Sequence, residues 1–121
     1  MSDSGSAAGS DVLSGVNWVA SHRGSGPAVV SISLLGDVSP ILDAAIVNLV
    51  NSGVTVVAAA GNTNVDAKVI SPARVEVAIT VGASDINDVK ASFSNYGAII
   101  DVWAPGTQRL LTVLKANSPM L

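Results

Sequence analysis

The sequence has 121 residues, which suits a single domain without room for a second core. Its formal net charge is −3 and its six Lys and Arg residues are scattered, which excludes the basic patch that nucleic-acid binding requires. No apolar run approaches the roughly 18 residues of a membrane span, so we expect no membrane partner. Aromatic residues make up 3% and charged residues 12%, so the core must be aliphatic and little polar surface is left to cover a monomer.

The first half of the chain alternates helical and strand-like segments. Residues 1–10 are predicted to be a flexible lead, and apolar spacing favours a helix over 11–22, with Ser10 or Asp11 as N-cap. A run rich in β-branched residues at 28–34 predicts a buried strand. A second helix is expected over 39–52, because Ser39 can serve as N-cap and Pro40 suits the first helical position.

The second half continues with strands. Apolar runs predict strands at 54–60, 77–81 and 99–103, separated by turn-rich segments. Helices and strands that alternate in this way indicate an α/β domain with a mostly parallel sheet of about four strands. Right-handed crossovers would place both helices on one face of that sheet. Residues 108–121 are assigned to no element.

Seven sequence blocks, together covering about residues 11–107, resemble the subtilisin-like serine proteases (subtilases) of the proteinase K type. The run 54–62, Val-Thr-Val-Val-Ala-Ala-Ala-Gly-Asn, is similar to the strand and turn that present the oxyanion-hole Asn of that family. The other blocks, in family order, are Gly-Val-Asn-Trp-Val-Ala at 15–20, Val-Val-Ser-Ile-Ser-Leu at 29–34, Ser-Pro-Ala-Arg at 71–74, Ile-Thr-Val-Gly-Ala-Ser-Asp at 79–85, Ala-Ser-Phe-Ser-Asn-Tyr-Gly at 91–97 and Asp-Val-Trp-Ala-Pro-Gly-Thr at 101–107. The resemblance implies a three-layer subtilase fold, here truncated to a partial domain at 11–107 with a divergent tail at 108–121.

The three segments that carry the family's catalytic triad have no counterpart in these 121 residues. The family's Asp and His segments precede the first helix, and its Ser segment follows the block at 101–107, where this sequence diverges at Gln108. The resemblance therefore implies a serine endopeptidase domain that is inactive by the triad mechanism. His22, the only histidine, does not match the catalytic position, and we expect it to lie on the surface at a helix end. A makeshift pair of His22 with Ser21 or Ser25 is the alternative.

The resemblance also implies substrate-binding residues. Asn62 would donate its amide to an oxyanion, although it can also be read as a simple turn residue. Two backbone stretches would pair with an extended peptide; they are Ser33, Leu34, Leu35 and Gly36, and Ala59, Ala60 and Gly61. The family usually has Gly where this chain has Leu35, so we expect a crowded cleft and weaker peptide binding.

A calcium site is also implied by the resemblance. Its ligands would be the backbone carbonyls of Glu76 and Ala78 and the carboxylate of Asp101, a set of oxygen atoms that suits Ca²⁺. Asp101 can equally be an exposed or capping carboxylate. No cofactor is required by the chemistry that the sequence indicates.

The retained helices belong to one face of the family's sheet, so the other face would be bare. A bare apolar face favours self-association, and we expect a homo-oligomer, or a cover made by the tail through Leu110, Leu111, Val113, Leu114 and Met120. An edge near 28–34 would also be open to strand pairing.

Three functions remain open. The chain is a subtilase-derived domain without triad activity, a hydrolase or esterase with a non-family site, or a non-catalytic module that binds itself, a peptide or calcium. The family is typically extracellular, whereas no signal peptide is encoded here, so the sequence leaves the localisation unknown.

Overall fold

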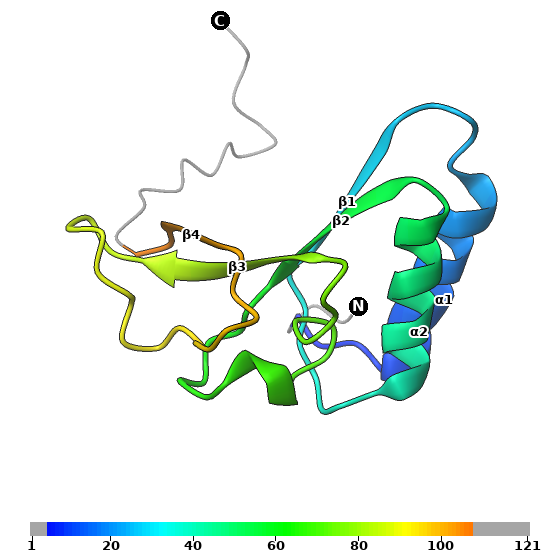
Figure 1. Cartoon of the computed structure of the whole chain (residues 1–121). Coiled ribbons are helices and arrows are strands. Elements are labelled where there is room, and N and C mark those ends of the chain that lie inside the picture. The colour runs from blue at the N-terminus through cyan, green and yellow to red at the C-terminus, as the bar shows by residue number, and fades with distance from the viewer. Residues whose placement is uncertain (1–4, 108–121) are drawn as a thin grey trace, which may run out of the picture.

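A computed structural model describes residues 5–107 of the chain (Figure 1). In chain order the elements are α1 (Gly9–His22), β1 (Ala28–Ile32), α2 (Pro40–Asn51), β2 (Val54–Ala59), the short 3₁₀ helix η1 (Ala67–Val69), β3 (Ile79–Ser84) and β4 (Val102–Pro105). The expectations for residues 1–4 and for the tail 108–121 lie outside the described residues.

The four strands form one parallel sheet in the order β1-β2-β3-β4. The expected α/β architecture with a parallel sheet is therefore confirmed. Two strands are displaced from the predicted ranges, since β3 begins at Ile79 and β4 at Val102. Ile99 and Ile100, which were expected to open the last strand, instead pack against a small cluster formed by Ala60, Ala67 and Ala73.

The second helix begins as the sequence predicts, whereas the first does not. Ser39 caps α2, where its hydroxyl accepts a hydrogen bond from the Leu42 N–H at 3.4 Å, and Pro40 takes the first helical position. The expected N-cap of α1 is wrong: Ala8 takes that place without a side-chain bond. The Ala8 carbonyl already accepts the N–H of Asp11 at 2.9 Å, so the helix starts before Ser10 and Asp11 can cap it.

Both helices lie on the same side of the sheet (Figure 1). The main core is formed where they meet alternate residues of β1 and β2, and its most buried members are Ile46 and Leu49 of α2 and Val54 and Val56 of β2. Residues on the opposite face are more exposed; Val29 is 71% exposed, Ile79 41% and Val102 46%. The pairing register places these three side chains on one face, because strand residues alternate between faces. We call this the open face.

Candidate functional site

The carboxyl ends of parallel strands meet at one edge of the sheet, and this edge carries the residues predicted to bind substrate. A cavity of about 310 Å³ opens there. Its lining includes Ser33, Ala59, Ala60, Gly61 and Asn62, and it extends onto the sheet itself along all four strands, from Ser31 and Val57 to Val81 and Ala104. The structure thus brings together the predicted oxyanion residue, the whole of the second substrate stretch and the first residue of the other.

Asn62 follows directly after the tight turn at Gly61. Gly61 has a φ of +104°, a conformation that residues with a Cβ rarely adopt. The Asn62 side chain is exposed, and within residues 5–107 it makes no hydrogen bond. Its amide N–H groups are therefore available to an acceptor in the cavity.

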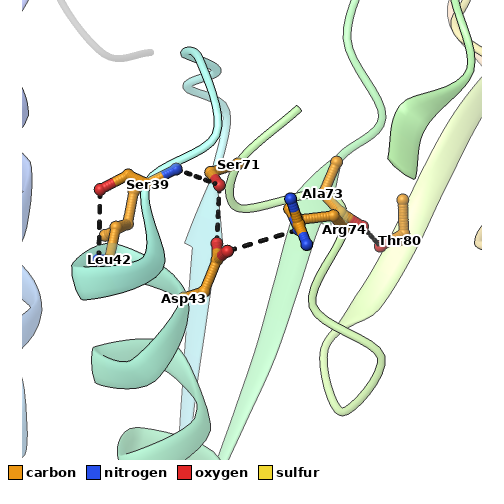
Figure 2. Close-up of polar contacts among 7 residues, drawn as sticks. All are labelled: Ser39, Leu42, Asp43, Ser71, Ala73, Arg74 and Thr80. Carbon is orange, nitrogen blue, oxygen red and sulfur yellow. Dashed lines mark hydrogen bonds and ion pairs between the residues drawn. The ribbon is translucent and has the colours of Figure 1, made fainter. Parts of the chain in front are cut away.

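The first substrate stretch is fastened to the loop that follows β2. Gly36 and Ser71 exchange two backbone hydrogen bonds, at 3.0 and 3.1 Å, in an isolated antiparallel bridge. The buried Ser71 hydroxyl donates to the Asp43 carboxylate at 2.7 Å and accepts the Ser39 N–H at 3.0 Å. Figure 2 shows the two hydrogen bonds of the Ser71 hydroxyl, and also Arg74, whose Nε is 3.4 Å from the other carboxylate oxygen of Asp43. The start of α2 therefore fixes the position of Gly36.

Leu35 belongs to the first substrate stretch, and its side chain reaches toward the second. One of its methyl carbons, Cδ2, is 3.1 Å from the point where a Cβ on Gly61 would sit. Leu34, Leu35 and Gly36 line a separate hollow of about 530 Å³, and Ser33 lines both cavities. The Leu35 side chain thus occupies space over Gly61 of the second stretch.

The predicted calcium ligands are only partly gathered. Glu76 and Asp101 line a hollow of about 540 Å³, and Ala78 is buried outside that lining. Asp101 is well oriented, because its Oδ2 accepts the Thr80 N–H at 2.7 Å. Among residues 5–107, no three His, Cys, Asp or Glu side chains come together as a metal site, so any cation here would depend on backbone carbonyls.

His22 lies far from Asn62 in the fold. It ends α1 just before β1 begins, whereas Asn62 follows the opposite, carboxyl end of β2. The His22 ring stacks on Trp18 with centroids 4.5 Å apart, and its Nδ1 is 2.9 Å from the Trp18 carbonyl oxygen. The Ser21 hydroxyl donates to the Asn17 carbonyl at 3.0 Å, so its proton is not directed at the His22 ring.

The structure adds a residue that the sequence did not single out. Asn95 is fully buried, and its side chain makes four hydrogen bonds to the loop around Asn62. The block at 91–97 contains this residue, but no spacing in a turn-rich segment marks an Asn as buried.

Comparison with known proteins fits this arrangement of strands and loops. The sequence profile described as the subtilase family matches residues 1–120. The chain belongs to the subtilase family. An extracellular serine proteinase from Thermus sp. (strain Rt41A) is 53% identical over 102 residues, which are 84% of this chain and 25% of that protein. Alkaline serine exoprotease A from Vibrio alginolyticus is 49% identical over 108 residues, 89% of this chain and 20% of the relative.

The subtilase fold is confirmed by a solved structure. A cold adapted subtilisin-like serine proteinase superposes with a TM-score of 0.86 at 48% identity, over 89% of this chain and 39% of the solved one. The chain spans a quarter or less of the length of the Thermus and Vibrio relatives. In the part that the structure describes, no helix has the length and apolar character needed to cross a membrane.

Proposed function

We propose that this subtilase chain provides the substrate-binding and oxyanion-binding half of a serine endopeptidase site, with the attacking and proton-transferring groups supplied outside these 121 residues. The observation that carries the proposal is the cavity that collects Ser33, the second substrate stretch and Asn62, whose amide has no hydrogen-bond partner among residues 5–107. Stabilising an oxyanion and positioning a peptide are separable from the nucleophilic step, so one half can hold both without turnover.

The geometry supports peptide binding by backbone pairing. The two substrate stretches continue the neighbouring strands β1 and β2, and Gly36 is fixed by its bridge to Ser71. An extended peptide laid against such segments forms main-chain hydrogen bonds, and side-chain pockets then add specificity. Leu35 limits the space for those side chains.

The proposal is tested by measuring hydrolysis and binding on the same sample. Peptide and p-nitrophenyl ester substrates are assayed together with a serine-directed covalent inhibitor. We expect no turnover and no labelled Ser, while NMR titration with an extended tetrapeptide shifts the amide signals of residues 33–36 and 59–62. Stoichiometric labelling of one Ser, with ester hydrolysis lowered in Asn62→Ala, would instead establish a hydrolase with a site of its own. If the amide signals of these residues do not shift at any peptide concentration, the proposed peptide binding is wrong.

A second role, self-association, is favoured by the open face. None of the four strands contains an Asp, Glu, Lys or Arg, so the face offers no charge to repel a second copy. Monomeric proteins rarely leave a contiguous apolar patch of more than a few hundred Å² uncovered. Burying such a patch contributes several kcal/mol before the entropy of association is subtracted. We propose that two copies pack through their open faces, a pairing that would also cover the cavity, because Ala59 and Val81 belong to both.

Light scattering over a concentration series tests this pairing. Ile79→Lys places a charge on the open face and is expected to shift the mass to that of a monomer. Ile41→Lys is the matched control, because Ile41 is an exposed isoleucine on α2, away from that face. A wild-type mass equal to the monomer at all concentrations, or equal effects of the two variants, would exclude the open face as the interface.

A further inference from the structure

The loop that carries Asn62 is bound to a segment thirty residues later in the chain. We define the Asn62 loop as residues 60–65. Backbone hydrogen bonds join it to residues 93–96 at three points: Asn95 N–H to the Gly61 carbonyl at 2.9 Å, Asn64 N–H to the Phe93 carbonyl at 2.9 Å, and Tyr96 N–H to the Val65 carbonyl at 3.0 Å. The loop therefore takes its path from this neighbouring segment.

The Asn95 side chain fills the inside of the Asn62 loop. Its Oδ1 accepts hydrogen bonds from the Thr63 N–H, the Thr63 hydroxyl and the Val65 N–H, each at 3.0 Å. Its Nδ2 donates to the Ala60 carbonyl at 2.7 Å. One fully buried carboxamide thus holds the residues on both sides of Asn62.

Gly61 allows this close approach. A Cβ at Gly61 would collide with the Asn95 Nδ2, and the φ of +104° also disfavours any other residue there. Since Asn62 makes no hydrogen bond of its own within residues 5–107, its direction is set by the backbone at Gly61 and Thr63. Both of those residues are bonded to Asn95.

We propose that Asn95 is the positioning residue of the Asn62 amide. It holds the loop in the one path that turns the Asn62 side chain toward the cavity at the carboxyl edge of the sheet. The effect of Asn95 on catalysis, the alignment of an oxyanion donor, rests on the proposed function. The effect of Asn95 on the order of the Asn62 loop does not rest on it. The two effects can be measured separately.

The structural arm compares hydrogen exchange in Asn95→Ala and the wild type. We expect the protection of the Thr63 and Val65 amides to fall at least tenfold, because Asn95 Oδ1 is the acceptor for both N–H groups. The amides of β2 should keep their protection. Thr80→Val is the control: it removes one buried hydroxyl bond, to the Ala73 carbonyl at 2.8 Å, away from this loop. Unchanged protection of Thr63 and Val65 in Asn95→Ala would overturn the proposal.

A second variant covers the case in which Asn95→Ala does not fold. Asn95→Asp keeps an oxygen acceptor for Thr63 and Val65 and loses the donor to the Ala60 carbonyl. We expect it to retain protection at those two amides. If both variants fail to fold while Thr80→Val folds, Asn95 supports the whole domain and not the loop, and the proposal is wrong.

The functional arm uses acetyl-Ala-Ala-Ala-Ala as the free carboxylate and as the C-terminal amide. The carboxylate stands in for an oxyanion, since a charged acceptor gains more from an amide donor than a neutral one. We expect Asn62→Ala to weaken binding of the carboxylate peptide about tenfold and to affect the amide peptide much less. Asn95→Ala should give the same selective loss.

The double variant decides whether the two residues act on one interaction. If Asn95 works through Asn62, the double variant loses no more than either single variant, because the same hydrogen bond is removed. Fully additive losses would show that Asn95 acts independently, which overturns the positioning role. A wild-type protein that does not distinguish the carboxylate from the amide refutes the proposed function, and the exchange arm still decides whether Asn95 orders the loop.

Discussion

Replacing Leu35 by Gly should open the cleft between the two substrate stretches. The Leu35 side chain reaches over Gly61, with 3.1 Å between its Cδ2 and the position of a Cβ there, and it is 45% exposed. It therefore stands on the surface that an extended peptide would cover. Removing it leaves a space of about the size of one side chain, bordered by the backbone of both stretches.

The exposure of Leu35 sets the size of two effects of Leu35→Gly, a loss of folding stability and a gain in peptide affinity. A fully buried Leu contributes about 1.5–3 kcal/mol, and this one is about half buried, so its loss costs about 1 kcal/mol of folding stability. The added backbone freedom of Gly costs roughly 0.5–1 kcal/mol more. A peptide side chain that fills the vacated space regains burial of the same kind, and about 1.5 kcal/mol corresponds to roughly a tenfold gain in affinity.

The assay is calorimetric or NMR titration with acetyl-Ala-Ala-Ala-X carboxylates in which X is Gly, Ala, Leu or Phe. We expect Leu35→Gly to bind the Leu and Phe peptides about tenfold more tightly than the wild type and the Gly peptide about equally. Val38→Gly is the matched control, because Val38 is 44% exposed and three residues away, outside the lining of either cavity. A gain that is the same for every X, or that also appears in Val38→Gly, would refute the reasoning.

Three further outcomes follow from contacts in the structure. Asn62→Ala should change the melting temperature by no more than about 2 °C in a thermal melt, because the side chain is exposed and makes no hydrogen bond within residues 5–107. Ser71→Ala should cost about 1–3 kcal/mol in urea unfolding, since it leaves the Ser39 N–H and one Asp43 oxygen without this partner; a loss within 0.5 kcal/mol would contradict the role given to that contact. We also propose that Ca²⁺ binds at Asp101 with the carbonyls of Glu76 and Ala78, so calcium should raise the melting temperature of the wild type but not of Asp101→Asn. Equal shifts in both proteins would place any bound ion elsewhere.

The sequence was sufficient for the elements whose signals are local. The β-branched run before Gly61 identified β2, and the pair Ser39-Pro40 located the start of α2, because strand propensity and capping act within a few residues. The resemblance supplied Asn62, and the structure places it in a cavity with its predicted neighbours.

Contacts between distant residues could not be predicted. Ser71 and Asp43 are 28 positions apart, and Asn95 and Thr63 are 32 apart. Neither pair belongs to a periodic pattern, so no spacing rule selects them. For the same reason the predicted range of β4 began too early. Ile99 and Ile100 have the composition of a strand, and only the structure shows that they pack against the cluster of Ala60, Ala67 and Ala73.

The sheet order β1-β2-β3-β4 follows the order of synthesis. Each strand after β1 pairs with the strand that precedes it in the chain, so no strand of this unit has to wait for a partner beyond the next one. Successive strands pair at registers such as Ala28 with Val54 and Val81 with Val102, so each pairing closes a loop of similar length. Within residues 5–107 the sheet can therefore form one strand at a time in chain order, and both edge strands, β1 and β4, are left with a free edge that can accept a neighbour.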